Sequence, residues 1–355
     1  MSNKKTLLSV VIVNALAVSA LAQADELEIY GTVAAAVESL DNGADSFTQV
    51  SNNHSAFGVK GSTDLGDGLK GVFLFDTFLG TDSGDSGNGS LFGGGRDGFV
   101  GLAGGFGTIA LGYHGRPWKT STNNMDIFGS TIADYSALMG STPGGAYFDG
   151  GIGNSAIWFM PNFNGFSGQL QFGADEEDDD SSDMGLHLNY SADNLYVTLS
   201  HDVDGQATGA ADGVAGDDDV TATKIAGQFS FGSSTVGVIF ESINDSEANT
   251  RDAFWLAGSH QMGSLTLKAA VAQADDSDAP GDKDGATYFA LGLDHAFKDN
   301  VTGYVIYSQI SNDDAGTYSF ASTPHTSSNT KTAVSAGEDT SVFAVGVKVG
   351  FNLKK

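Results

Sequence analysis

Apolar and polar residues alternate along most of the chain, so that every second side chain belongs to the same class. The run 265–271 reads Leu-Thr-Leu-Lys-Ala-Ala-Val, and the run 343–353 reads Phe-Ala-Val-Gly-Val-Lys-Val-Gly-Phe-Asn-Leu. Side chains of a β-strand point alternately to its two faces, so a period of two means that the two faces meet different environments. The pattern predicts amphipathic β-strands, and helical spacing is weak throughout.

About sixteen such runs follow one another, most of them near the ~9–11 residues that a tilted strand needs to cross a bilayer. The predicted strands are 27–40, 54–61, 69–80, 96–103, 107–114, 152–160, 167–174, 184–191, 194–202, 221–231, 234–243, 252–261, 264–274, 286–296, 301–311 and 340–351.

The connectors between these runs alternate in length. Short turns occur at 66–68, 104–106, 162–165, 192–193, 232–233, 262–263 and 299–300, and the long loops are 41–53, 81–95, 115–151, 175–183, 203–220, 244–251, 275–285 and 312–339. Transmembrane barrels have this asymmetry, with tight periplasmic turns and long outer loops. All five prolines fall outside the runs, as expected because proline cannot donate to a strand ladder.

The sequence therefore predicts an all-β fold, a transmembrane antiparallel β-barrel of about 16 strands. The strands of a soluble β protein also alternate between apolar and polar residues, but such a protein does not need short and long loops in alternation. Aromatic residues near strand ends or within apolar faces are expected to form the girdles at the lipid interfaces. These are Tyr30, Phe73, Phe75, Phe99, Trp158, Tyr190, Trp255 and Phe351.

The N-terminus has the features of a secretory signal peptide. Lys4 and Lys5 precede an apolar stretch at 7–21, and small residues follow at 20–24. We expect a signal peptide over residues 1–24, cleaved after Ala24, and a barrel domain over residues 25–355. A retained helical anchor is the alternative, but the apolar stretch is shorter than the ~20 residues that span a bilayer. Export through the periplasm to the outer membrane is the predicted route.

Charge and composition exclude several function classes. The 355 residues include 16 Lys plus Arg and 44 Asp plus Glu, a net charge of −28, and no Cys. A chain this acidic is not expected to bind nucleic acid, because phosphate neutralisation needs a basic surface. The acid concentrates in long loops, at 175–180, 217–219 and 275–276. Two interpretations remain open for these runs: a solvated face, or weak binding of divalent cations and lipopolysaccharide.

No motif predicts an enzyme or a cofactor. The stretch Gly84-Asp85-Ser86-Gly87 is similar to a serine-protease nucleophile loop, but no histidine is marked as its base. The seven histidines never occur at metal-ligand spacing, so we expect no metal site. No phosphate-binding glycine loop is present. We predict that the protein is not an enzyme and holds no cofactor.

Three stretches resemble the general Gram-negative porins. Residues 27–32 read Leu-Glu-Ile-Tyr-Gly-Thr, residues 57–70 read Phe-Gly-Val-Lys-Gly-Ser-Thr-Asp-Leu-Gly-Asp-Gly-Leu-Lys, and residues 96–102 read Arg-Asp-Gly-Phe-Val-Gly-Leu. The resemblance implies a sixteen-stranded barrel, usually a homotrimer, whose third loop (115–151 here) folds into the pore. Two departures stand out: Ala56 takes a place where the family often has arginine, and Asn-Leu-Lys-Lys follows Phe351 where the family usually ends on an aromatic residue.

The resemblance also implies a pore constriction in which acids on the third loop face bases on the wall. Matched by position, the candidates are Lys60 and Arg96 on the wall and Asp126 and Asp134 on the loop. Arg116 and Lys119 are further candidates, because they lie at the start of the loop.

The predicted function is a water-filled channel for passive diffusion of ions and small hydrophilic solutes. We expect it to prefer cations, because acidic loops attract cations and the strand runs hold few bases. The expected partners are two further copies in a homotrimer, outer-membrane lipid, lipopolysaccharide and the solutes themselves. The alternatives are a substrate-preferring outer-membrane channel, or a secreted or surface β protein acting as an adhesin or ion-binding layer.

Overall fold

The computed structural model describes residues 24–82, 92–142, 147–174, 182–205, 219–244, 250–278, 283–320 and 333–355. The predicted signal peptide lies outside these residues except for Ala24, as do the acidic run 175–180, most of the run 217–219 and the protease-like stretch 84–87. Among the described residues, no helix has both the length and the apolar composition required to cross a bilayer.

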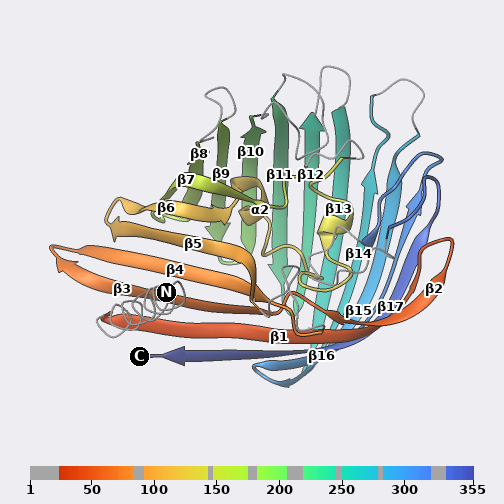
Figure 1. The fold of residues 1–355 in the computed structure, drawn as a ribbon, viewed down its shortest axis with the longest axis horizontal. Helices are drawn as coiled ribbons and strands as arrows, with labels where there is room; N and C mark the ends of the chain where they lie inside the picture. The colour runs from red at the N-terminus through yellow and green to blue at the C-terminus, as the bar shows by residue number, and fades with distance from the viewer. Residues whose placement is uncertain are drawn as a thin grey trace, which may run out of the picture.

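The described chain is almost entirely β-strand (Figure 1). The strands are β1 (Glu26–Asp41), β2 (Ser46–Asn52), β3 (Ala56–Gly66), β4 (Leu69–Leu79), β5 (Phe92–Gly104), β6 (Gly107–Gly115), β7 (Gly151–Phe159), β8 (Phe166–Gly173), β9 (Asp183–Ala192), β10 (Leu195–Asp204), β11 (Val220–Phe231), β12 (Ser234–Asn244), β13 (Thr250–Met262), β14 (Leu265–Ala274), β15 (Ala286–Lys298), β16 (Val301–Asn312) and β17 (Thr340–Lys354). Two short helical segments, α2 (Pro117–Thr120) and η1 (Tyr135–Ala137), lie between β6 and β7.

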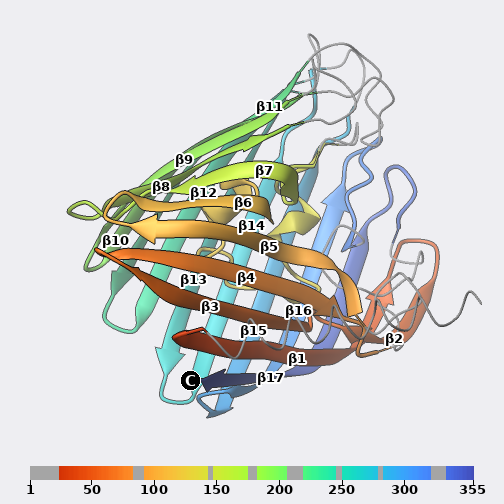
Figure 2. The ribbon, with the colours of Figure 1, turned by 60° about the vertical axis from the view of Figure 1, so that its left-hand side comes forward.

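Antiparallel pairing of neighbours runs from β3 through to β17, and β17 returns to pair with β1, from Glu28 opposite Lys354 to Asp41 opposite Ser341. The other edge of β1 pairs with β3 near its start and with β2 near its end. Strands β2 and β3 therefore share one position, and the sheet closes as a barrel of sixteen positions (Figures 1 and 2). The predicted barrel is confirmed, with one correction: the predicted loop 41–53 contains β2.

The two faces of the strands differ as the alternation predicts. On β17, the side chains of Val345 and Val347 are 47% and 43% exposed on the outer face, whereas Ala344 of the same strand is fully buried on the inner face. The same outward row of large apolar side chains continues on the other strands. Lipid is the environment that such an apolar belt requires on a closed barrel.

Three of the predicted interface aromatics prove to be interior residues. Trp255 is buried and packs edge-on against Tyr135, Tyr30 donates a hydrogen bond to Asp76, and Phe99 contacts His114. The prediction was wrong for these three because apolar residues also occupy the inner face wherever they pack on another part of the protein. Phe75, Trp158 and Phe351 do lie exposed on the outer face.

The main hydrophobic core lies inside the barrel, not between two sheets. It joins residues between β6 and β7 to the inner faces of β11–β17. About half of the wall residues in this core are alanine, including Ala222, Ala257, Ala272 and Ala290, whereas others are large, such as Trp255 and Tyr288. The alanines leave room for the large side chains of the loop, as close packing requires.

Candidate pore constriction

The segment 116–150 is named L3 here, and its described parts, 116–142 and 147–150, fold into the barrel instead of leaving it (Figure 1). Pro117 starts α2 at a helix position where no backbone N–H is needed. Trp118, Phe128, Ile132, Leu138 and Met139 of L3 are each fully buried against the wall. Their apolar surface explains why L3 lies on the wall, since water would otherwise contact it.

Two carboxylates shape the turns of L3. Asp126 accepts backbone hydrogen bonds from Phe128 at 2.9 Å and from Tyr135 at 3.1 Å. Asp134 accepts from the backbone N–H groups of Ser130 and Ser136, and it caps the short helix η1. Such side-chain bonds to nearby backbone N–H groups stabilise turns.

Basic residues of the barrel wall hold L3 in place from β11, β13 and β17. The buried Lys224 ammonium lies 3.2 Å from the centroid of the Trp118 ring and donates a hydrogen bond to Thr122 at 2.7 Å. Lys348 donates to the Gly129 carbonyl at 2.9 Å. These lysines therefore act as anchors beneath the loop.

An ion pair and a hydroxyl complete the anchoring. Arg251 pairs with Glu241 at 2.8 Å, with both side chains almost fully buried, and it also donates to the Ser141 carbonyl of L3. Glu241 in turn accepts the Gly140 N–H at 2.9 Å, and Tyr288 donates to the Ala133 carbonyl at 2.6 Å. The far part of L3 is thus fixed by charged groups that no solute can reach.

The opposite wall, formed by β3–β6, carries charged groups that remain accessible. The Arg96 guanidinium lies 5.2 Å from the Phe78 ring centroid and 3.9 Å from the Asp76 carboxylate, and Tyr30 donates to the same carboxylate at 3.1 Å. His54 stacks on Phe78, with ring centroids 4.6 Å apart. The Arg96 side chain is 32% exposed, whereas Asp76 is 8% exposed.

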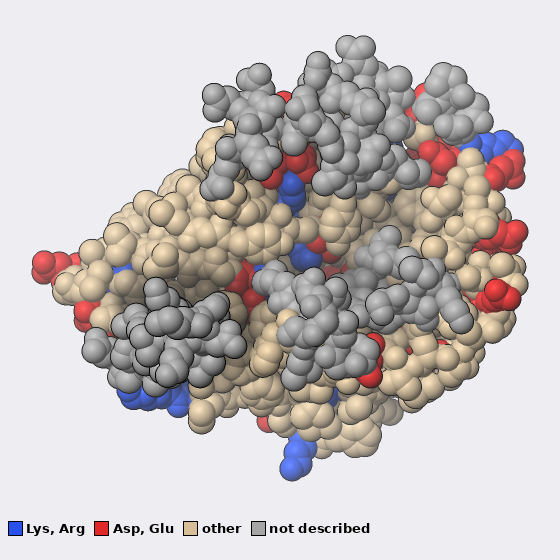
Figure 3. All heavy atoms as spheres, in the orientation of Figure 1, with Lys and Arg blue, Asp and Glu red and all other residues tan. Residues whose placement is uncertain are grey.

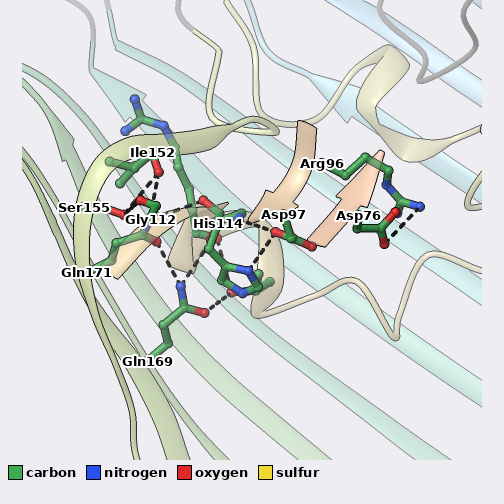
Figure 4. Close-up of polar contacts among 12 residues, drawn as sticks. Asp76, Arg96, Asp97, Gly112, His114, Ile152, Ser155, Gln169 and Gln171 are labelled. Carbon is green, nitrogen blue, oxygen red and sulfur yellow. Dashed lines mark hydrogen bonds and ion pairs between the residues drawn. The ribbon is translucent and has the colours of Figure 1, made fainter. Parts of the chain in front are cut away.

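A row of polar groups continues from Arg96 along the inner surface of β5–β8 (Figure 4). Asp97 accepts the Gly115 N–H at 3.1 Å and lies 2.7 Å from His114 Nδ1. Gln171 donates to the His114 carbonyl, and Gln169 donates to the Gly115 carbonyl. The row fixes the end of β6, where L3 begins.

Two cavities lie along this wall inside the barrel, and L3 lines only the smaller one. One, of about 350 Å³, is lined by His54, Phe78, Arg96, Asp97, Lys119 and Asp149 among others. The second, of about 670 Å³, is lined by Glu28, Lys60, Leu74, Phe99 and Phe159 among others, and both include His114 in their lining. Figure 3 shows both signs of charge gathered in the recess of one face, flanked by large areas without charge.

Comparison with known proteins now decides the family. A family model described as Gram-negative porin matches residues 8–315. The chain belongs to this family. The porin is accordingly an outer-membrane protein.

Curated relatives and solved structures agree with this assignment. The chain is 34% identical to the major outer membrane protein P.IA of Neisseria meningitidis over 125 residues, 35% of this chain and 30% of that protein. It is 33% identical to the outer membrane porin protein 32 of Delftia acidovorans over 126 residues, 35% of each chain. These alignments therefore span about a third of the relatives' length.

The fold of the porin matches solved structures over most of its length. The anion-selective porin from Comamonas acidovorans has a TM-score of 0.78 at 23% identity, covering 92% of this chain and 100% of that one. OmpF of Salmonella typhi has a TM-score of 0.71 at 16% identity, covering 92% and 97%. At these identities the likeness shows the fold.

The structure brings three of the predicted constriction residues to the cavities. Arg96 and Lys119 line the smaller cavity, and Lys60 lines the larger one. Lys119 also donates to the carbonyl of Asp149 at 2.7 Å, which joins the two ends of L3. Arg116 is nearly buried instead, and it pairs with Asp204 at 2.6 Å and with Asp183 at 3.4 Å.

The two predicted acids, Asp126 and Asp134, use their oxygens within L3, as described above. Burial, followed by the charge of Asp134, raises the pKa of Asp126 well above its usual range. Burial likewise raises the pKa of Asp149, while the neighbouring Lys119 ammonium opposes the shift. A constriction role for Asp126 and Asp134 stays a prediction.

Sequence reasoning did not identify several residues of this site. Asp76 contacts the predicted base Arg96, Asp97 contacts His114, and Lys224 and Arg251 hold L3. The only feature of the sequence that could have indicated these residues is a charged residue at a position of a strand run whose side chain points into the barrel. Among the described residues, no cluster of three metal-ligating side chains occurs.

Proposed function

We propose that the protein forms a water-filled channel through which ions and small hydrophilic solutes diffuse down their gradients. The observation that carries this proposal is the pair of adjoining cavities with charged linings, inside a closed barrel whose outer face is apolar. L3 is anchored to one wall, so the space beside the other wall stays available to solutes. Members of the Gram-negative porin family and their fold are associated with channels and not with enzymes, which supports the same function.

The ion preference should depend on two zones of opposite character. The described connectors between β14 and β15 and between β16 and β17 hold eight carboxylates and one lysine: Asp275, Asp276, Asp278, Asp284, Asp313, Asp314, Glu338, Asp339 and Lys283. In the constriction two bases, Arg96 and Lys119, are 32% and 26% exposed, whereas of the acids beside them Asp97 is 26% exposed, Asp76 8% and Asp149 3%. The accessible bases therefore outnumber the accessible acids there.

We infer a preference for cations at low salt that declines as salt rises. Charges at the mouth act through bulk water, and the Debye length falls from ~30 Å at 0.01 M to ~3 Å at 1 M salt. Charges in the constriction act at short range and are screened less. The solved neighbour described as an anion-selective porin supports a contribution from such constriction bases in this fold.

We also propose a homotrimer in outer-membrane lipid and lipopolysaccharide. One solved neighbour, OmpT of Vibrio cholerae, is described as a trimer form, with a TM-score of 0.64 at 18% identity. The apolar outer face supplies a surface that either lipid or another barrel can cover. Unheated gel electrophoresis with cross-linking should give a band at three times the monomer mass.

Planar bilayer recording tests the proposal. The refolded protein should give stepwise conductance increases in KCl, and a KCl gradient at low concentration should give a reversal potential of the sign for cation preference. That potential should shrink as both concentrations are raised toward molar. Absence of conductance steps would contradict the channel, and anion preference at low salt would contradict the two-zone assignment.

A further inference from the structure

An aromatic patch lies on the inner wall of the larger cavity, where a water-filled channel needs none. The rings of Phe99 and Phe159 are 5.6 Å apart, and each meets the His114 ring nearly edge-on, with centroids 5.8 Å and 5.1 Å away. All three side chains are half-buried, so part of each ring faces the cavity. Leu74 and Val72 extend the apolar surface toward β3.

A positively charged group borders this patch. Lys60 lies 3.4 Å from the Glu28 carboxylate, and Lys354 approaches the same carboxylate at 3.5 Å. Two lysines thus share one carboxylate, and that carboxylate also accepts a hydrogen bond from Asn352. The Lys60 side chain is 46% exposed, against 19% for Glu28. Glu26, which also lines this cavity, is 69% exposed and pairs with Lys70 at 3.4 Å. Lys60 and the 68% exposed Lys354 share the single carboxylate of Glu28, so the charge beside the patch is positive.

The strand register fixes the distance between the patch and the charge. Lys60 of β3 lies directly opposite Leu74 of β4, and Leu74 lies directly opposite Phe99 of β5. Neighbouring strands are ~4.8 Å apart, so the backbones of Lys60 and Phe99 are separated by about 10 Å. An aromatic ring resting on Phe99 with a carboxylate directed toward Lys60 fits this separation, since the lysine side chain extends part of the way.

We propose that this wall is a binding subsite for small aromatic carboxylates, with the ring on Phe99, Phe159 and His114 and the carboxylate at Lys60. The subsite deepens the proposed channel function and rests on it. Aromatic rings prefer edge-to-face or offset contacts with one another, which an aliphatic ring of equal size cannot reproduce. The channel would therefore retain an aromatic anion longer than either an aliphatic anion or a neutral aromatic solute.

Current block in planar bilayers tests the subsite with matched probes. Benzoate, cyclohexanecarboxylate and benzyl alcohol are added at pH 7, and the concentration that halves the KCl current is measured for each. Benzoate should halve the current at about three- to tenfold lower concentration than cyclohexanecarboxylate, the range expected of one or two aromatic contacts. Benzyl alcohol should need about threefold more than benzoate, because it lacks the charge.

Variants assign the effect to the named side chains. F99L with F159L keeps an apolar wall and should remove the benzoate advantage over cyclohexanecarboxylate. F75L on the outer face of β4 is the matched control and should leave it unchanged. K60Q should raise the half-blocking concentration of benzoate about threefold but leave benzyl alcohol unaffected, whereas K283Q in an outer loop should change neither.

The outcomes separate the subsite from the channel. A channel that conducts KCl but shows equal block by benzoate and cyclohexanecarboxylate overturns the subsite and leaves the proposed function standing. A benzoate advantage that survives F99L with F159L also overturns it. No conductance at all overturns both proposals. The wild-type probe series needs no variant, so it decides the question even if the double variant does not fold.

Discussion

The two inner walls of this barrel use basic residues in opposite ways. On the wall under L3, Lys224 and Arg251 are buried and bonded to the loop. On the facing wall, the side chains of Lys60 and Arg96 are 46% and 32% exposed. The same residue types therefore hold the loop on one side and can meet solutes on the other. Burial separates the roles, because a buried charge must be paired while an exposed one can remain available.

The largest effect is expected when a buried basic residue under L3 loses its acidic partner, which tests whether buried bases hold the loop. E241A leaves Arg251 buried without its carboxylate and removes the acceptor of the Gly140 N–H. Loss of one partner of a buried pair costs about 3–5 kcal/mol, so we expect L3 to detach. Protease cleavage within L3 of the folded barrel in detergent should become much faster.

The matched control is D314A, which removes the partner of Lys283 from an exposed ion pair. Exposed pairs contribute about 0–1 kcal/mol, so L3 cleavage should not change. Equal cleavage of the two variants would contradict the anchoring role of the Arg251 pair.

The next effect is expected at Lys224. K224M removes the ammonium above the Trp118 ring and its bond to Thr122. A desolvated cation–π contact is worth about 2 kcal/mol, so L3 should loosen without leaving the wall. Open-channel current noise should rise, and K283M should leave it unchanged. A K224M channel as quiet as the wild type would show that apolar packing alone holds this part of L3.

A smaller effect on stability but a clear one on selectivity is expected on the facing wall. R96Q removes an accessible charge whose nearest carboxylate, Asp76, is 3.9 Å away. Because the pair is partly exposed, barrel stability should change by less than about 1 kcal/mol. The reversal potential in a KCl gradient should move toward stronger cation preference. A shift of equal size in K283Q would assign the effect to total charge, not to the constriction.

The smallest effect concerns pH and Asp126. Its raised pKa means that folded L3 binds a proton more readily than unfolded L3, so L3 should become more stable as the pH falls through the folded-state pKa. The charges of Asp134 and Asp149 raise the pKa of Asp126 further, and burial also raises the pKa of Asp149, which therefore contributes in the same direction. D126N should weaken the rise in protease resistance that accompanies a fall in pH. An unchanged pH profile in D126N would exclude Asp126 as its source.

The alternation of residues predicted the barrel well because each strand meets lipid on one face and a polar or packed interior on the other. It failed for β2, where Thr48 and Val50 point outward and Gln49 and Ser51 inward, so the two faces differ little. It also misplaced Trp255, since an apolar residue that packs under L3 has the same pattern as one facing lipid.

The candidate site was less accessible to sequence reasoning. Matching by position led to Arg96 and Lys60, and the place at the start of the loop led to Lys119; all three line the cavities. It could not separate the lysines under L3 from those beside it, because that difference depends on the path of a loop with no regular structure. The inward bases were also undervalued, since no predicted strand run contains more than one Lys or Arg and most contain none.

The glycines under L3 have a consequence for the width of the passage. A Cβ atom at Gly292 would come within 2.7 Å of the Phe128 ring, and one at Gly237 within 3.1 Å of the Met125 methyl group. The flexible Met125 side chain can shift to accept a methyl group at Gly237, but a larger residue at Gly292 would push the Phe128 ring, and L3 with it, toward the facing wall. The bore of the channel can thus be narrowed by a substitution at a position that no permeating molecule touches.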